Sequence, residues 1–188
     1  DLEDSCRAVA FKKQYPNRFF SVGIAEQDMM GTAVGLALAG KIPFACSFSE
    51  FIVGKTLEQL RMAVCSQKAN VKIVGSHGGL SVGPDGATAE ALEEFTHMRS
   101  LPSMTVIAPC DALEAKRATL AAAAHVGPVF LRLGRAPVPQ VTKPTEAYHI
   151  GQAQVLRPGA DVTIIACGVM GAHALQAAEE LAKEGMDV

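Results

Sequence analysis

The sequence of 188 residues lacks several features that would assign it to particular classes of protein. Its five cysteines are widely spaced and form no C-x-x-C pair, which argues against a disulfide framework or a zinc site and predicts reduced, mostly buried thiols. It has no Lys/Arg-rich run and a formal net charge of -2, so nucleic acid is not expected as a partner. No apolar stretch reaches the roughly 20 residues of a membrane-spanning helix. We therefore expect a cytoplasmic protein without a membrane partner.

What the sequence contains is typical of a folded domain with a proper core, since 49% of residues are apolar and 19% are charged. Short apolar runs alternate with helical patterns, and these runs lack the two-residue alternation of strands that face water. This order predicts an α/β fold with a doubly wound, mainly parallel sheet and helices on both faces. The predicted strands are 19–22, 42–46, 71–75, 104–108 and 129–133, and the predicted helices are 25–39, 55–67, 88–99 and 111–125.

A stretch without periodicity and with three prolines divides the chain. The predicted parts are a first domain at 1–135, a linker at 136–150 and a truncated second domain at 151–188. The last part offers one strand at 161–166 and one helix at 168–184, which is too little for a core of its own. Because the sequence starts without Met and stops in a strand-like run, we expect it to be a piece of a longer chain.

One acidic side chain occupies the first turn of a predicted helix. Glu26 lies in the run Gly23-Ile24-Ala25-Glu26-Gln27, where the free amides and the dipole of a helix start favour a carboxylate. The helix has no charge after Asp28, so we expect it to be buried on nearly all sides, with Gly31 and Gly35 allowing another backbone to approach. A carboxylate beside buried surface is costly without a partner. Either Glu26 only caps its helix, or it meets a ligand.

A glycine-rich loop at 76–86 carries further candidate chemistry between a predicted strand and a predicted helix. His77 can move a proton near neutral pH, and Asp85 can accept hydrogen bonds from hydroxyl groups. The alternative is a plain connection in which the backbone satisfies the histidine. The loop matches no P-loop and no Gly-x-Gly-x-x-Gly pattern.

Aromatic and basic residues at two strand ends leave similar alternatives open. Phe48 and Phe51 either pack in the core or offer an apolar face to a flat heterocycle. Arg132 and Arg135 are either exposed to solvent or placed to hold a phosphate.

Five motifs in this order make the chain resemble the pyrimidine-binding domain of transketolases, and most of all the separate C-terminal subunit of split bacterial or archaeal transketolases. They are the Gly23 to Gln27 run, Phe48-x-x-Phe51 followed by 59–63, the 76–86 loop, Met98-Arg99-Ser100-Leu101-Pro102, and Leu131-Arg132-Leu133-Gly134-Arg135. Residues after about Tyr148 resemble the start of the transketolase C-terminal domain.

The resemblance implies thiamine diphosphate as cofactor. The reaction it implies is transfer of a two-carbon ketol unit from a ketose phosphate to an aldose phosphate. By the same matching, Glu26 is catalytic and would hydrogen-bond the pyrimidine ring nitrogen opposite the amine from a poorly solvated position. Phe51, with Phe48 behind it, would pack on the pyrimidine.

The resemblance also implies four residues on the substrate side. His77 would act near the substrate hydroxyls and in proton transfer, and Asp85 would bind a substrate hydroxyl. Arg135 would hold the sugar phosphate together with Ser5, whose surroundings match the family loosely.

The family binds the diphosphate through Mg²⁺ or Ca²⁺ on another domain, with a Gly-Asp-Gly sequence that is absent here. The resemblance therefore implies an N-terminal diphosphate-binding subunit or domain as partner, and a homo-oligomer formed through the Glu26 helix. Pro84 replaces the family's usual Glu, and Ala89 replaces a His or Gln that reaches cofactor and substrate. The alternatives are a 1-deoxyxylulose-5-phosphate synthase-like enzyme and a non-catalytic assembly subunit with the same fold.

Overall fold

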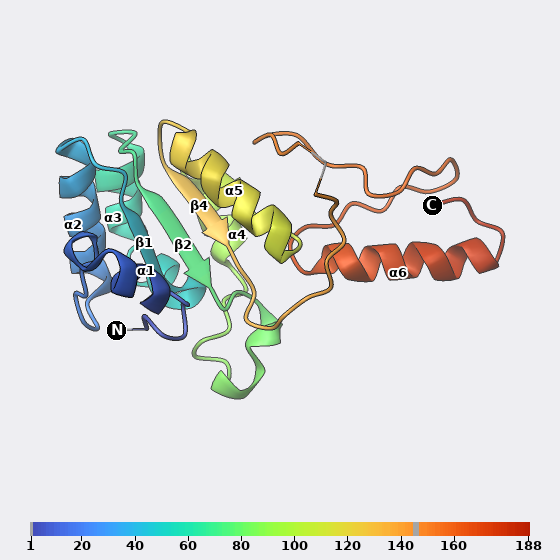
Figure 1. Ribbon diagram of the computed structural model, residues 1–188, viewed down its shortest axis with the longest axis horizontal. Helices are drawn as coiled ribbons and strands as arrows, with labels where there is room; N and C mark the ends of the chain where they lie inside the picture. The colour runs from blue at the N-terminus through green and yellow to red at the C-terminus, as the bar shows by residue number, and fades with distance from the viewer. Residues whose placement is uncertain (1, 145–146) are drawn as a thin grey trace.

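The computed structural model describes residues 2–144 and 147–188 of the chain. In Figure 1, the N-terminus lies in a body that contains the sheet, and the long helix α6 lies beside this body. The strands are β1 Phe44–Phe48, β2 Lys72–Ser76, β3 Thr105–Ile107 and β4 Val129–Arg132. The helical elements are α1 Val9–Gln14, η1 Pro16–Arg18, α2 Glu26–Leu38, η2 Glu50–Gly54, α3 Leu57–Gln59, η3 Leu60–Cys65, η4 Leu80–Asp85, α4 Glu94–Ser100, α5 Ala112–Ala124 and α6 Met170–Lys183.

The strands form one parallel sheet in the order β1-β2-β4-β3, which confirms the predicted α/β fold. Helical chain connects successive strands, because parallel neighbours require a crossover. Within the sheet β2 pairs with both β1 and β4, so that Ile73 lies between Ala45 and Phe130. The carboxyl ends of the strands share one edge, where ligands gather in sheets of this kind.

Apolar side chains cover both faces of the sheet, because alternate residues of a strand point to opposite sides. On one face, Phe130 of β4 belongs to a cluster with Met30 of α2 and Met98 of α4. On the other face, Leu131 packs in a cluster with Ala118 of α5. The sheet is therefore wound on both sides, as the sequence predicts.

Two of the predicted strands do not form. Residues 19–22 belong to no ladder, and Phe20 is 62% exposed. Residues 161–166 also form no strand; the amides of Asp161 and Val162 bond to the carbonyl of Asp187, and Ile165 is 90% exposed. A strand needs a neighbour for its backbone groups, and no segment in the described ranges pairs with either run.

The long helices match their predicted bounds better than the short ones. Both α2 and α5 begin and end within one residue of the predicted positions. The predicted helix 88–99 begins only at Glu94, because the amide of Gly79 bonds to the carbonyl of Ala91 and holds that residue in a β-bridge with Gly78. The predicted helix 55–67 is a short α3 between two π-helical stretches, η2 and η3. Such wide turns are frequent at functional sites.

The prediction that α2 is buried on nearly all sides is wrong for this chain. Only Met30, Ala33 and Val34 of the helix are buried. On its outer side, a side chain added at Gly31 or Gly35 would meet nothing within 4 Å. The helix therefore has one packed face and one uncovered face of small residues.

The residues after the sheet are held by a buried carboxylate. Asp111 caps α5 by accepting from the amide of Glu114 at 2.8 Å, and it also accepts from the amides of Val141 at 2.9 Å and Thr142 at 2.7 Å. Part of the predicted linker is thus tied to the start of α5, while its residues 145 and 146 lie outside the described residues.

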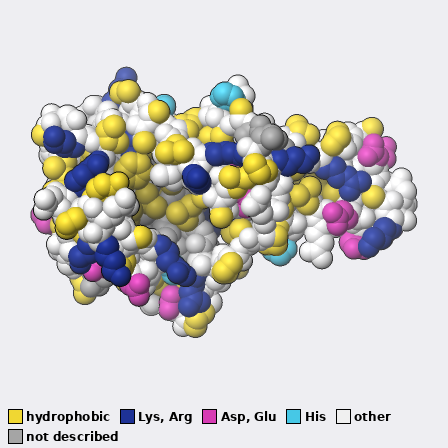
Figure 2. All heavy atoms as spheres, in the orientation of Figure 1, with side chains coloured by type: hydrophobic (Ala, Val, Ile, Leu, Met, Phe, Trp, Pro, Cys, Tyr) yellow, Lys and Arg dark blue, Asp and Glu magenta, His cyan; other side chains and the backbone are white. Residues whose placement is uncertain are grey.

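The remaining surface is mixed in character. Figure 2 shows apolar side chains spread over the sheet-bearing body, and acidic and basic side chains together at the far end beyond it.

All five cysteines are free, but only Cys65 and Cys110 are buried, so the prediction of mostly buried thiols is wrong. Among the described residues, no helix has both the length and the apolar character needed to cross a membrane.

Candidate active site

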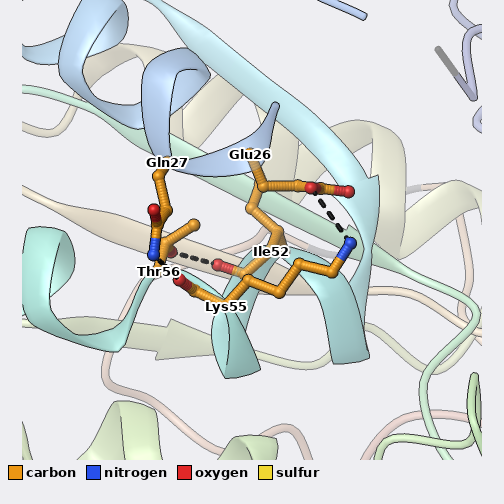
Figure 3. A network of polar contacts seen from close by, with 5 residues as sticks. All are labelled: Glu26, Gln27, Ile52, Lys55 and Thr56. Carbon is orange, nitrogen blue, oxygen red and sulfur yellow. Dashed lines mark hydrogen bonds and ion pairs between the residues drawn. The ribbon is translucent and has the colours of Figure 1, made fainter. Parts of the chain in front are cut away.

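Glu26 lies at the amino end of α2, after a turn in which Gly23 has a φ of 74° that suits glycine. Its side chain is 10% exposed, and its Oε2 lies 3.2 Å from Nζ of Lys55. Figure 3 shows the two side chains meeting across the gap between α2 and the turn after η2. Gln27 ties the same two segments together, because its Nε2 donates to the backbone carbonyl of Lys55 at 2.9 Å.

Two stacked aromatic rings adjoin the carboxylate. Phe48 ends β1 and Phe51 lies in η2, and their ring centroids are 5.6 Å apart at an interplanar angle of 21°. The ammonium of Lys55 lies 4.7 Å from the centroid of Phe51, within the range of a cation–π contact. One cation therefore contacts both the carboxylate of Glu26 and the ring of Phe51.

A cavity of about 240 Å³ opens at this point. Glu26, Phe51 and Lys55 contribute to its wall, together with Leu2, Gly23, Ile24, Met29, Cys46 and Ser47. The wall is thus largely apolar, with one carboxylate and one ammonium facing each other. Such a combination suits a flat ring that carries one polar edge.

His77 follows β2 and lies behind the aromatic pair. Its ring stacks on Phe48 with centroids 3.8 Å apart, and its φ of 55° is uncommon for a residue with a side chain. Nδ1 of His77 lies 3.1 Å from Oγ of Ser76, which is 3.3 Å from both the carbonyl of Ser47 and Sγ of Cys6. Burial lowers the pKa of His77, which keeps the imidazole neutral near pH 7.

Asp85 and Arg135 belong to the same end of the sheet. The negative charge of Asp85 opposes the lowering of the His77 pKa, and the positive charge of Arg135 adds to it. Arg135 is held by a hydrogen bond from its Nη1 to the carbonyl of Val82 at 3.0 Å. Ser5 is exposed and precedes Cys6, the residue whose thiol contacts Ser76. The predicted site residues therefore come from segments that meet at one edge of the sheet.

Arg132 has a different role from the phosphate contact considered from sequence. Its Nε donates to Oε1 of Glu94 at 2.9 Å, and the two side chains are only 12% and 2% exposed. Gly78 and Gly79 leave room for the guanidinium, since an added Cβ would lie 2.3 Å and 2.5 Å from its nitrogens. Arg132 is thus part of the scaffold under the glycine-rich loop.

Lys55, Ser76 and Gln27 are site residues that the sequence analysis missed. Lys55 follows Phe51 by four positions, and one helical turn brings its cation over that ring, but the predicted helix began only at residue 55 and so left Phe51 outside it. Its contact with Glu26, 29 residues away, has no counterpart in any local pattern.

The donor set fits one part of thiamine diphosphate and not the other. A carboxylate beside an aromatic wall suits an aminopyrimidine, which offers flat apolar faces and a ring nitrogen for hydrogen bonding. For the diphosphate and its cation, the described residues contain no group of three or more His, Cys, Asp or Glu side chains that could hold a metal.

Comparison with known families gives this arrangement its context. The family described as transketolase, pyrimidine binding domain, matches residues 1–141. The chain belongs to the transketolase family. The transketolase C-terminal domain matches residues 151–188. The domain boundaries predicted at 135 and 150 stay a prediction.

Transketolase relatives cover nearly the whole chain. A Methanocaldococcus jannaschii protein named as a transketolase C-terminal section is 42% identical, over 99% of this chain and 60% of that protein. The 6-deoxy-6-sulfo-D-fructose transketolase subunit SqwH of a Clostridium species is 41% identical, over 99% and 58%. A structure titled split gene transketolase, inactive beta4 tetramer, superposes with a TM-score of 0.89 at 44% identity, over 99% and 60%. The chain thus spans about 60% of the length of these transketolase relatives.

Proposed function

We propose that this chain supplies the pyrimidine-binding half of a transketolase active site. When bound, thiamine diphosphate would supply the carbon nucleophile that carries a two-carbon ketol unit from a ketose phosphate to an aldose phosphate. The observation that carries the proposal is the carboxylate of Glu26, 10% exposed at the wall of a cavity that it shares with Phe51.

On the cofactor side, each residue would have a simple task. Glu26 would hold a proton at the pyrimidine ring nitrogen opposite the amine. In this way it would influence that amine, which is the base within the cofactor itself. Phe51 would bind the flat face of the ring, and Phe48 would support Phe51 by stacking.

On the substrate side, His77 would hold or move a proton at the substrate hydroxyls. Its neutral imidazole can do either, and Asp85 would accept a hydrogen bond from another hydroxyl. Arg135, with Ser5, would bind the sugar phosphate through charge-assisted hydrogen bonds. The site would be completed by an N-terminal subunit or domain that binds the diphosphate and Mg²⁺ or Ca²⁺, in a cytoplasmic homo-oligomer joined through α2.

A second candidate function is a non-catalytic assembly subunit. It is favoured by Ala89, which is buried in a cluster with Phe48 and Val82 and provides no polar group where the resemblance implies a His or Gln. This alternative predicts that no partner subunit would restore ketol transfer. A synthase-like thiamine enzyme remains the other catalytic alternative.

The test is Glu26→Gln in the protein combined with its N-terminal partner. If the proposal holds, exchange of the thiazolium proton of bound thiamine diphosphate, followed by NMR, slows by about 10² to 10⁴-fold. Asp28→Asn is the matched control, because Asp28 is exposed in the first turn of the same helix. Near-normal exchange in Glu26→Gln would remove Glu26 from the mechanism.

A further inference from the structure

We infer that Lys55 is a displaceable counter-ion, a positioning residue that holds Glu26 and covers Phe51 until the aminopyrimidine ring takes over both contacts. This inference rests on the proposed function, because it concerns the same cavity. It assigns to Lys55 a part in cofactor entry that neither the sequence pattern nor the resemblance implies.

A single atom of Lys55 contacts both of the groups that the ring would need. Nζ of Lys55 lies 3.2 Å from Oε2 of Glu26 and 4.7 Å from the ring centroid of Phe51. All three side chains line the same cavity. A ring that packs on Phe51 and bonds to Glu26 therefore competes with the ammonium for both partners.

The ammonium of Lys55 is also free to leave the cavity. The side chain of Lys55 is 48% exposed, whereas that of Glu26 is 10% exposed, so the pair lies at the rim of the cavity with its cation toward solvent. A lysine ammonium on a flexible four-carbon stem is readily hydrated, and an ion pair whose cation is half exposed is weak. The contact can thus break without disturbing the core.

The backbone of Lys55 is held independently of its side chain. Gln27 donates to the Lys55 carbonyl at 2.9 Å, and the hydroxyl of the next residue, Thr56, donates to the carbonyl of Ile52 (Figure 3). Both contacts use groups that remain when the Lys55 side chain changes. The side chain of Lys55 can therefore move its ammonium into solvent, or be replaced by substitution, while the turn that carries Phe51 stays in place.

Breaking the ion pair between Lys55 and Glu26 makes cofactor binding weaker, by an amount that depends on the charge of residue 55 and on the salt concentration. Binding of the ring must break the ion pair, so a neutral side chain at position 55 removes a competitor for Glu26. Because the ammonium of Lys55 is 48% exposed, salt screens the ion pair and reduces the same cost in the unaltered protein. A role of Lys55 that was only structural would produce neither effect.

The experiment measures the dissociation constant of thiamine diphosphate, at saturating Mg²⁺, for the protein combined with its N-terminal partner. The variants are Lys55→Met, which removes the charge and keeps an extended side chain, and Lys55→Arg, which keeps the charge. Lys41→Met is the matched control, because Lys41 is exposed beyond the opposite end of α2, about 20 Å from Glu26 along the helix. Thermal unfolding of each variant shows whether it is folded.

At about 50 mM NaCl, Lys55→Met is expected to bind thiamine diphosphate about three-fold more tightly than the unaltered protein, while Lys55→Arg and Lys41→Met bind as it does. The advantage of Lys55→Met disappears at about 500 mM NaCl. It also disappears in the Glu26→Gln background, where the ion pair no longer exists.

Equal or weaker binding by folded Lys55→Met at low salt would overturn the inference, and so would an advantage that persists in the Glu26→Gln background. These outcomes leave the proposed function intact, because the protein still binds the cofactor. Failure of every protein, including the unaltered one, to bind thiamine diphosphate would instead contradict the proposed function itself.

Discussion

Two ion pairs lie close to the same edge of the sheet, and they differ in almost every physical respect. Glu94 and Arg132 are joined at 2.9 Å, and their side chains are 2% and 12% exposed. Glu26 and Lys55 are joined at 3.2 Å, and their side chains are 10% and 48% exposed. In the first pair the cation lies under the glycine-rich loop and only the carboxylate lines a cavity, whereas both members of the second pair line a cavity.

The difference lies in what surrounds each cation. The guanidinium of Arg132 is enclosed by the backbone at Gly78 and Gly79 and lies 5.2 Å over the ring of Phe95, so its position is fixed by packing. The ammonium of Lys55 has solvent on one side and a cavity on the other. An ion pair is structural where its cation cannot leave, and it can take part in ligand exchange where the cation can.

The largest effect that would test this comparison is on stability. Arg132→Met leaves the carboxylate of Glu94 buried without its cation, and we expect the free energy of unfolding to fall by about 3–5 kcal/mol. Lys55→Met should lower it by less than about 1 kcal/mol, because the ammonium that it removes is 48% exposed and forms only a weak ion pair. Denaturant unfolding of the two variants measures both values.

A double variant separates the charge from the packing at this site. Glu94→Leu combined with Arg132→Met replaces the buried pair by apolar groups and should recover most of the lost stability. If Arg132→Met alone cost no more than Lys55→Met, the distinction between the two pairs would be wrong.

Neither ion pair could be predicted from the sequence, although most of the helices and strands that carry the four side chains could be predicted. The partners are 29 and 38 residues apart, and they meet only because a parallel sheet aligns the carboxyl ends of its strands. Local signals were more informative. The bounds of α2 and α5 were predicted to within one residue, since they depend on neighbouring residues alone.

The errors have one physical cause in common. Residues 19–22 and 161–166 have the apolar pattern of strands, but a strand forms only where another segment pairs with it. The same holds for burial of α2, whose outer face at Gly31 and Gly35 is uncovered in the single chain. The apolar pattern of a segment predicts the conformation of that segment better than it predicts which other segments pack against it.

Substitution of Gly78 would show whether the two glycines enclose the guanidinium of Arg132. In Gly78→Ala, the added methyl group would lie 2.3 Å from Nε of Arg132, so the guanidinium must shift from Glu94. We expect a loss of about 1–3 kcal/mol in unfolding free energy, as for other overpacked sites. A loss below about 0.5 kcal/mol would mean that the guanidinium has room to move.

Gly31→Ala is the matched control, because nothing lies within 4 Å of an added Cβ there. In the single chain, it should stabilise α2 by up to about 1 kcal/mol through helix propensity. If α2 packs against another copy of the chain, as proposed, Gly31→Ala should weaken that assembly. Sedimentation measurements would detect the change.

A third carboxylate, that of Asp111, is buried and forms no ion pair with any of the described residues. Asp111 is 3% exposed, and its oxygens accept from the amides of Glu114, Val141 and Thr142 and from the Thr142 hydroxyl. Burial alone would raise its pKa, but these hydrogen bonds outweigh burial and lower the pKa below its ordinary value of 3.8. The stabilisation is therefore present above about pH 4 and is lost as the pH falls through the lowered pKa.

Asp111→Asn replaces one accepting oxygen by a donor that faces backbone amides, and should cost about 1–2 kcal/mol at neutral pH. The gap in unfolding free energy between the two proteins should narrow as the pH falls through the lowered pKa of Asp111, because the protonated carboxyl of the unaltered protein has lost the same capacity. Urea unfolding across this pH range measures the gap. If this difference in unfolding free energy stayed constant with pH, the negative charge of Asp111 would not contribute to stability. The hydrogen bonds to Asp111 would then not stabilise a buried carboxylate in the way that a cation stabilises Glu94 and Glu26.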